Sequence, residues 1–559
     1  MKTEPQDNLR ALILEGEETI VSGFNNERRL NLIELARAMD YYFVGRNFNS
    51  NWVKTDGVEK YASLLAFGLH KALNLSLDKS SKYKGAPLFR STPALQMWAN
   101  ATLVLCGQLG YCEHLLELQR VGLVEIEKIG SDKYHAHIVS SPYGIESFER
   151  ENFAWTRNIV AMMDQEYANA LSVHAESIKN LMSARVEAWR THYIQYTTSP
   201  EIDAFYQRVG LLQARMMLGN DAFPHDKKFG GQEFGLYCAA VTILVGWSRK
   251  HLDFCFELLK KRPFLDPQNI VTITSALEDE VEYLSAALEV DSTTAKQLIE
   301  TLTLNNENKK EHCSIPGNLI TPIFIEIGEN KLLRPVWGSM SEPFLFLLHE
   351  LRNRYHSDWD DAVNWREQAF RNDLYSLLLS DRFYKLNRSA ILKNNGQRIT
   401  DVDAFILDRK TGEVGLFQLK WQDFIGNSMR ERESKKKNLL REGNQWIEKV
   451  TDWLSRVDKK TIAQTFNLNP NDAAIANSFR LFLIGRNSAF FSGDWPIDSR
   501  AAWGMWPQLC RLISSLQNYE NPIASLFLSL QEDSPIKKEP PQIFPEELKI
   551  GDVTIVLDT

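Results

Sequence analysis

The stretch ITDVDAFILDRKTGEVGLFQLKWQ (residues 399–422) contains two apolar segments, DAFIL and VGLFQLK, separated by the polar sequence RKTG. Apolar residues on both sides of a glycine-containing turn predict an antiparallel β-hairpin. Four polar side chains gather at the end of this hairpin away from the turn: Asp401, Asp403, Gln418 and Lys420. Because strands that are otherwise apolar seldom bury charged groups without a partner, this stretch also predicts a chemical site.

The turn fixes which residues face each other across the hairpin. Closure through RKTG places Asp403 opposite Gln418 and Asp401 opposite Lys420, and alternate residues of a strand share one face. A one-residue bulge at Gly412 would shift this register slightly. In either case an acid, an amide and a lysine converge within the distance of cross-strand pairs.

The side chains at this end have the chemistry of a magnesium site. The carboxylate of Asp403 and the side-chain carbonyl of Gln418 are hard oxygen ligands of the kind that Mg²⁺ accepts. An amine beside them, from Lys420, can orient a water molecule and stabilise charge on a phosphate.

A helix upstream of the hairpin adds a further acid. Glu367 lies at helical spacing on the apolar stripe formed by Val363, Phe370, Leu374 and Leu377. Glutamate is rarely buried unless it is paired or bound to a metal. A helix that faces the sheet is therefore expected to aim Glu367 at Asp403.

A helix glutamate, then an aspartate, then Gln-x-Lys on the next strand resemble the PD-(D/E)xK nuclease superfamily. The Gln-x-Lys variant is similar to that of Mrr-like restriction endonucleases. The resemblance implies that Asp403 binds the metal, with Asp401 as the alternative. It also implies that Gln418 supplies its carbonyl oxygen, that Lys420 is the catalytic lysine, and that Glu367 contacts the metal through water.

The resemblance implies a fold, an activity and a cofactor as well. The core would be a mixed sheet flanked by helices, and the activity would be hydrolysis of phosphodiester bonds, of DNA before RNA, with Mg²⁺ or Mn²⁺. The sequence departs from the family pattern at two places. Thr400-Asp401-Val402 precedes Asp403 without a proline, and Gln418 stands where the family usually has a glutamate.

The segment that follows the hairpin is a charged helix with a local excess of positive charge. An excess of this kind in an acidic protein suits contact with a phosphate backbone, and a solvated helix face explains it equally well. The candidate nucleic-acid-binding residues are Arg430, Arg432, Lys435, Lys436, Lys437 and Arg441.

Patterning along the chain predicts a multidomain, mostly α protein with a C-terminal α/β domain that resembles restriction endonucleases. Residues 1–145 are mainly helical, and the helix-plus-hairpin pattern of 114–141 resembles a winged helix. Residues 146–340 form a helical scaffold or sensor region that ends in a hairpin. The nuclease-like domain spans 341–535, and a proline-containing tail that ends in a possible strand spans 536–559.

Composition limits the class of protein. The 559 residues are 44% hydrophobic, carry a net charge of −8 and contain six cysteines without a CxxC pair. We expect a soluble cytoplasmic protein without a signal peptide or membrane span, because no apolar run approaches 18 residues and FGLYCAAVTILVGW (234–247) is typical of a buried helix. A protein that is mildly acidic overall needs a local basic surface to bind nucleic acid.

Other hypotheses stay open at this stage. His135 and His137 share a strand face but have no partners at metal-site spacing, and Cys313 beside His312 has no evident catalytic partner. The chain could be an inactive nuclease fold that binds nucleic acid or assembles with other proteins, or a helical scaffold with an incidental hairpin. A helical sensor fused to a nuclease resembles bacterial restriction or phage-defence effectors. A homodimer, or a protein partner or trigger that acts through the N-terminal helices, would fit that architecture.

Overall fold

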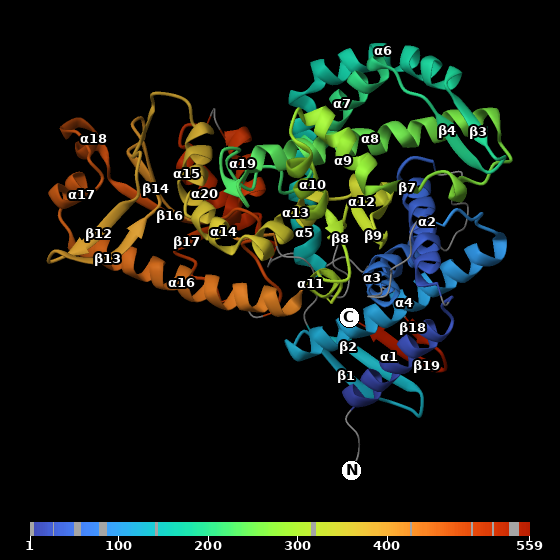
Figure 1. Cartoon of the computed structure of the whole chain (residues 1–559). Helices are drawn as coiled ribbons and strands as arrows, with labels where there is room; N and C mark the ends of the chain where they lie inside the picture. The colour runs from blue at the N-terminus through green and yellow to red at the C-terminus, as the bar shows by residue number, and fades with distance from the viewer. Residues whose placement is uncertain are drawn as a thin grey trace.

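The computed structural model describes residues 5–25, 27–49, 58–77, 87–139, 143–314, 320–424, 428–493, 496–516, 519–535 and 547–558. The described chain is mostly helical and contains one five-stranded sheet among several smaller ones (Figure 1). The apolar segment 234–247 lies in helix α8 (Phe234–Lys261), many of whose residues are buried inside the protein. Among the helices described, none is long and apolar enough to cross a membrane.

The N-terminal region contains four helices and the predicted hairpin. The helices are α1 (Pro5–Ser22), α2 (Arg28–Asn47), α3 (Val58–Ser76) and α4 (Pro93–Arg120), and the strands are β1 (Val124–Lys128) and β2 (Lys133–Ile138). The hairpin does not stand alone, because strands β18 (Glu547–Ile550) and β19 (Val553–Asp558) complete a sheet of order β1-β2-β19-β18. Strand β19 runs parallel to β2, so residues from the far end of the chain lie against the N-terminal region (Figure 1).

The middle region is helical with short hairpins between its helices. The helices are α5 (Tyr143–Met163), α6 (Gln165–Ala184), α7 (Pro200–Arg215), α8, α9 (Leu277–Leu288), α10 (Ser292–Thr301), α11 (Lys309–Cys313) and α12 (Val336–Met340). The hairpin predicted over 320–337 is confirmed as β9 (Phe324–Gly328) and β10 (Lys331–Arg334). It joins β7 (Ile273–Ala276) and β8 (Thr303–Leu304) in a sheet of order β7-β10-β9-β8.

One helix expected in this region is shorter than the sequence pattern suggests. The segment NALSVHAESIKNLMSARVEAWRTHYIQY (169–196) looks helical throughout, but the helix ends at Ala184. Strands β3 (Val186–Trp189) and β4 (Tyr193–Tyr196) follow as an antiparallel hairpin. Its turn contains Arg190 and Thr191, whose φ angles of 46° and 63° match the left-handed geometry of a tight hairpin turn. Aromatic and β-branched residues in the second half favour strands, which the helical spacing of the first half conceals.

The helical pattern of residues 343–381 forms three helices. These are α13 (Pro343–Arg354), α14 (His356–Val363) and α15 (Arg366–Ser376). The break between α14 and α15 falls at Asn364 and Trp365, so Val363 and Glu367 belong to different helices. This break changes which face of α15 is buried.

The five-stranded sheet contains both strands of the hairpin predicted within residues 399–422. Its order is β11 (Phe383–Lys385), β14 (Ala404–Asp408), β15 (Glu413–Lys420), β16 (Ser478–Gly485) and β17 (Ala501–Met505). Strand β14 is antiparallel to both of its neighbours, β11 and β15, whereas β15, β16 and β17 are parallel. The sheet is therefore mixed.

Helices cover both faces of this sheet. One face packs against α16 (Met429–Arg456), whose Trp446, Ile447 and Val450 are buried in the same core as Phe405 and Leu416. That side also holds the hairpin of β12 (Ala390–Asn394) and β13 (Gln397–Val402), together with α17 (Lys459–Thr465) and α18 (Pro470–Ile475). The opposite face packs against α15, α19 (Trp506–Leu516) and α20 (Pro522–Glu532).

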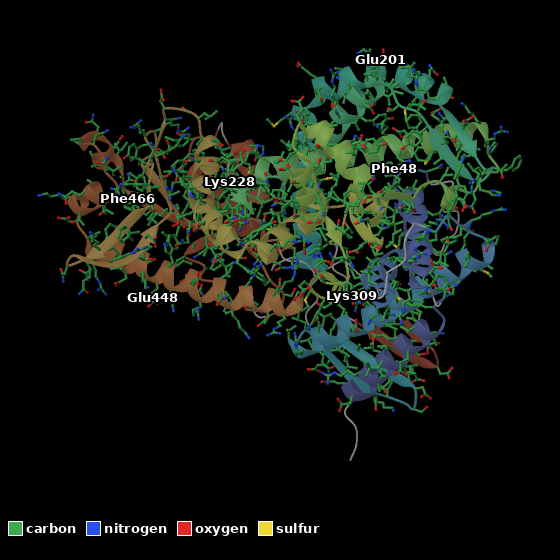
Figure 2. The ribbon with its side chains drawn as sticks, viewed as in Figure 1. Phe48, Glu201, Lys228, Lys309, Glu448 and Phe466 are labelled. Atoms are coloured by element: carbon green, nitrogen blue, oxygen red, sulfur yellow. The ribbon has the colours of Figure 1, made fainter. Side chains whose placement is uncertain are left out.

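Aromatic packing closes the α16 side of the sheet. Phe466, labelled in Figure 2, stacks on Phe405 of β14 with the ring centroids 4.4 Å apart. Helices and their aromatic side chains thus cover both faces of the sheet.

Candidate functional site

Strand pairing brings Asp403 and Gln418 together. Ala404 pairs with Phe417 and Phe405 with Leu416, which is the register expected from the RKTG turn. Asp403 immediately precedes β14, and its backbone N–H donates to the carbonyl of Phe417 at 2.9 Å. The Gln418 side-chain amide donates to the Asp403 carboxylate, and the backbone N–H of Leu419 donates to the same oxygen at 2.7 Å.

The carboxyl group of Asp403 lies in an environment that disfavours its charge. Asp403 is only 2% exposed to solvent. Burial raises the pKa of Asp403 to about 7, and the nearby acids Glu367 and Asp401 add to that rise. The hydrogen bond from Leu419 N–H and the positive charge of Lys420 oppose it. Acids whose pKa approaches neutrality through burial and like charge are frequent at functional sites. A cation bound at Asp403 would relieve this unfavourable electrostatic environment.

Lys420 is the last residue of β15 and reaches towards α16. Its Nζ lies 3.0 Å from Oε2 of Glu442. The lysine side chain is 28% exposed and Glu442 is 50% exposed, so this ion pair lies at the surface. It holds the amine at the same strand end as Gln418, two residues earlier.

Asp401 does not pair with Lys420 as the simple hairpin register suggested. It belongs to β13, where it faces Ile391 of β12, because the chain leaves the main sheet before Asp403. Its carboxylate receives a bond of 3.0 Å from Arg398, and its carbonyl accepts from the indole of Trp446 at 2.7 Å. Asp401 nevertheless stays close enough for its charge to raise the pKa of Asp403.

Glu367 lies near the site, but it is not on the buried face of its helix. Its side chain is 47% exposed, contrary to the apolar stripe drawn from the sequence. The stripe was wrong because α15 begins only at Arg366, and its buried residues are Arg366, Phe370, Arg371, Leu374 and Tyr375.

Sequence reasoning missed Arg371, which links Glu367 to the hairpin. Its guanidinium bonds Glu367 at 2.9 Å and also donates to the backbone carbonyl of Asp403. The i,i+4 spacing of Glu367 and Arg371 was the available signal, because such pairs meet on one side of a helix. Arg371 therefore fixes α15 against the start of β14.

The donor set suits a hard cation that keeps part of its water shell. Asp403 offers a buried carboxylate, Gln418 an amide, and Glu367 a half-exposed carboxylate nearby. In the part of the chain that the structure describes, the acids at this end do not form a close cluster of three ligands. Mg²⁺ is commonly held by one or two carboxylates and several waters, so the residues fit that ion. The Gln418 amide presents its nitrogen to Asp403 and would have to rotate to offer its oxygen.

The six basic residues of α16 that were candidates for nucleic-acid binding divide into two groups. Three are held by the protein itself: Arg432 bonds Glu149 at 3.0 Å, Lys435 the carbonyl of Asp423 at 3.2 Å, and Lys436 the carbonyl of Ser492 at 2.8 Å. The six candidates are therefore not equally available to contact a phosphate backbone. The exposed ones are Arg430, Lys437 and Arg441.

These three exposed residues share one side of α16, because spacings of seven and four return to the same helical face. Lys437 also contacts Glu433 at 3.4 Å, and Arg441 contacts the Asn438 side chain at 3.2 Å. Arg441 adjoins Glu442, the partner of Lys420. The exposed positive charge thus leads along the helix towards the candidate site.

The cysteine hypothesis loses support from burial. Cys313 is 7% exposed, and burial raises the pKa of its thiol to about 12. A thiol in this environment is not a nucleophile at neutral pH. His135 lies on β2 beside His137 and contacts Glu127 at 3.3 Å, an arrangement that an ordinary strand pair explains.

Comparison of the chain with protein-family models, with curated proteins and with solved structures gives no match.

Proposed function

We propose that this protein is a metal-dependent nuclease that hydrolyses phosphodiester bonds of DNA. The observation that carries the proposal is the grouping of Asp403, Gln418 and Lys420 at one end of two paired strands. The order helix α15, strands β11, β14 and β15, helix α16 and strand β16 supports it, because this is the flanked mixed sheet that the PD-(D/E)xK resemblance implies.

Each residue has a distinct role in this proposal. Asp403 and Gln418 would hold Mg²⁺ or Mn²⁺, with Glu367 contributing through water. The bound ion would supply Lewis-acid activation of a phosphate and a more acidic water. Lys420 would orient that water and stabilise negative charge on the phosphate, and Glu442 positions the Lys420 amine.

The exposed cations of α16 would hold the substrate backbone. Arg430, Lys437 and Arg441 carry no base-reading geometry of their own, so they would position DNA rather than select a sequence. The larger N-terminal and middle regions would then recognise the target, a partner or a trigger, as in restriction or phage-defence effectors.

A second function is favoured by one specific observation. The Gln418 side-chain amide donates a hydrogen bond to the Asp403 carboxylate. A glutamate at position 418 would instead have added a second negative charge to the site. A site with this weaker cation attraction fits a nuclease fold that binds nucleic acid without cleaving it.

The deciding experiment is cleavage of plasmid DNA and of a mixed RNA pool with Mg²⁺ or Mn²⁺. The wild-type protein is compared with Lys420→Ala and with Lys410→Ala, an exposed lysine in the turn at the opposite end of the same hairpin. The nuclease proposal expects cleavage by wild type and Lys410→Ala and a loss of at least about 100-fold in Lys420→Ala. Equal cleavage by all three proteins would exclude this site, and binding without cleavage would favour the second function.

A further inference from the structure

A separate cluster of ligand-type side chains lies between the middle region and the N-terminal helices. His312 comes from α11, and His349 and Glu350 come from α13. One ligand atom from each of the three lies within 4.8 Å of the other two. His312 and Glu350 are each 1% exposed, so the cluster is inside the protein.

The hydrogen bonding of this cluster leaves one buried atom unsatisfied. Nε2 of His312 lies 2.7 Å from Oε1 of Glu350, and Arg354 bonds the other carboxylate oxygen at 2.6 Å. Nδ1 of His312 is buried and has no hydrogen-bond partner within the described ranges. An unpaired buried nitrogen is costly, so the protein groups around the cluster do not fully satisfy it.

The second histidine is also suited to bind a cation. The ring centroids of His312 and His349 lie 4.6 Å apart. Nδ1 of His349 lies 3.0 Å from the side-chain amide nitrogen of Asn353. The Asn353 amide donates to Nδ1 in this orientation, and turning that amide by 180° would let Nδ1–H donate to its oxygen and leave Nε2 available to a metal.

We propose that His312, His349 and Glu350 bind one zinc-type divalent cation that ties α11 to α13. Two imidazoles and one carboxylate form a donor set that Zn²⁺ prefers and Mg²⁺ does not. A tetrahedral zinc ion with bonds of about 2.1 Å needs ligand atoms about 3.4 Å apart, so small side-chain rotations would close the observed cluster. The ion replaces the His312–Glu350 hydrogen bond, and Arg354 remains as the outer partner of Glu350.

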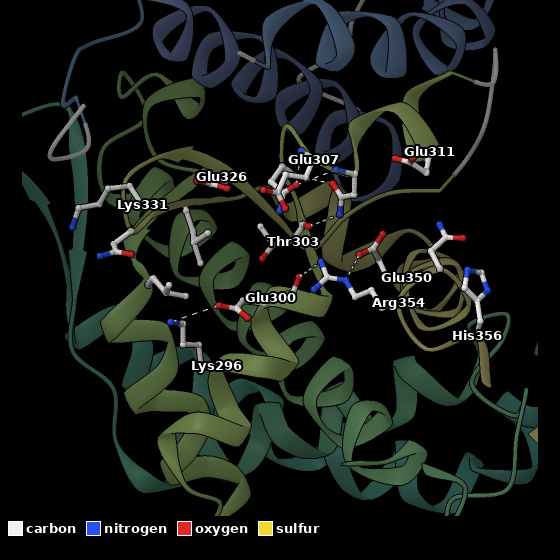
Figure 3. Close-up of a pocket in the computed structure, with 16 residues that line it drawn as sticks. Lys296, Glu300, Thr303, Glu307, Glu311, Glu326, Lys331, Glu350, Arg354 and His356 are labelled. Atoms are coloured by element: carbon white, nitrogen blue, oxygen red, sulfur yellow. Dashed lines mark hydrogen bonds and ion pairs between the residues drawn. The ribbon is translucent and has the colours of Figure 1, made fainter. Parts of the chain in front are cut away.

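A groove reaches Glu350 of this cluster. It has a volume of about 850 Å³ and is lined by Glu350, Asn353, Arg354 and His356 among others (Figure 3). Its lining contains five glutamates against two lysines and one arginine. The excess of negative charge raises the local concentration of cations at the approach to Glu350.

The position of the cluster gives the cation a structural consequence. Lys309, at the start of α11, donates to the carbonyl of Leu77 at 2.6 Å, and Figure 2 shows it between the N-terminal helices and the middle region. Helix α13 precedes α14 and α15, the helix that carries Glu367 and Arg371. A cation that joins α11 to α13 would therefore hold the N-terminal helices to the segment that leads into the sheet domain.

Cobalt titration of the whole protein tests this site without any measurement of activity. The protein is stripped with a chelator in an Asp403→Asn background, so that the proposed nuclease site does not contribute. Co²⁺ replaces Zn²⁺ in such sites and gives visible absorption when its coordination is tetrahedral. We expect one Co²⁺ per chain, displaced by one Zn²⁺.

Matched variants identify the ligands. His349→Gln and His312→Gln should each weaken Co²⁺ binding at least tenfold, because loss of an outer-shell partner alone costs about 10–100-fold. His356→Gln, which lines the same groove outside the cluster, should bind as the parent does. Circular dichroism shows whether each variant is folded. If His312→Gln unfolds, the test depends on Co²⁺ binding by His349→Gln, because His349 is only half-buried.

Two results would overturn the proposal: no visible Co²⁺ spectrum with the parent protein, or equal affinity of the parent and His349→Gln. Either result leaves the nuclease proposal untouched, because the measurement is made with Asp403 already replaced.

Discussion

The side chains of Asp403 and Gln418, on facing positions before β14 and in β15, are joined directly by a hydrogen bond in which the amide donates to the carboxylate. This contact satisfies a buried acid in the metal-free protein. It also means that the same two groups cannot both bind a cation until the amide turns. Because this hydrogen bond must break before both groups can bind a cation, cation binding at Asp403 and Gln418 is coupled to the stability of the sheet.

Replacement of Asp403 by Asn should stabilise the metal-free protein at high pH. With a folded-state pKa of about 7, Asp403 keeps a proton between about pH 4 and pH 7 that the unfolded chain has lost. Its contribution to the free energy of unfolding therefore falls as the pH rises through this window. We expect Asp403→Asn to be more stable than wild type at pH 8 by roughly 2–4 kcal/mol and about equal to it near pH 4.

Thermal denaturation in chelator at both pH values measures this difference. Asp408→Asn serves as the contrast, because burial of Asp408 is outweighed by bonds from Arg382, Lys410 N–H and Thr411 that lower its pKa. That variant should lose stability at pH 8. Equal behaviour of the two variants would contradict the assignment of a disfavoured charge to Asp403.

Substitution of Gln418 by Glu should strengthen the response to metal. The new carboxylate would face Asp403 at a cross-strand position, and the two like charges would destabilise the metal-free fold at pH 8. A bound Mg²⁺ offsets that repulsion, so the rise in Tm on adding Mg²⁺ should be larger in Gln418→Glu than in wild type. An unchanged rise, measured by differential scanning fluorimetry, would place the cation elsewhere.

The ion pair between Lys420 and Glu442 should affect catalysis only modestly. Because exposed pairs contribute about 0.2–1 kcal/mol, Glu442→Gln is expected to slow cleavage by no more than about fivefold. Glu448→Gln on the outer side of the same helix should leave the rate unchanged (Figure 2). A loss as large as that of Lys420→Ala would show instead that Glu442 acts directly at the site.

Substitution of the three exposed candidate cations of α16 should weaken DNA binding without unfolding the protein. Replacing Arg430, Lys437 and Arg441 with Ala removes up to three phosphate contacts, so the slope of log affinity against log salt should become shallower by about 2–3. Fluorescence anisotropy at several salt concentrations measures this slope. An unchanged slope would move the DNA-binding surface away from α16.

Substitution of an inward basic residue of the same helix should act on stability instead. Arg432→Ala leaves Glu149, which is 8% exposed, without its ion-pair partner, and we expect a loss of roughly 2–4 kcal/mol. The Ser488 hydroxyl also donates a hydrogen bond to the Glu149 carboxylate at 3.0 Å, so Glu149 would keep this partner in the variant. Chemical denaturation separates this effect from DNA binding.

The parts of the site that are local in sequence were predictable. The RKTG turn determines the register of β14 and β15, so the position of Asp403 opposite Gln418 followed from residue spacing. The position of Asp401 did not follow, because β13 leaves the main sheet to pair with β12, and nothing in an alternating pattern marks that change. Glu367 was misplaced for a related reason: helical spacing continues through Asn364 and Trp365, although the helix does not.

Contacts between distant segments were outside the reach of the sequence. A count of lysines and arginines on α16 cannot show that Arg432 is taken up by Glu149, which lies 283 residues away. The cluster of His312, His349 and Glu350 was equally hidden, because its ligands come from two helices separated by the β9–β10 hairpin. Such pairings are decided by tertiary packing rather than by local propensity.

The parallel pairing of β19 with β2 has a consequence for the order in which the protein folds. During synthesis, β2 emerges early and acquires its neighbour β1 at once, whereas its other neighbour comes more than four hundred positions later in the printed sequence. The five-stranded sheet has all its strands before β19 appears, so it can fold while the N-terminal sheet is still incomplete. Until then β2 exposes an unpaired edge, which makes the nascent N-terminal region dependent on late, non-local closure and open to strand-mediated association.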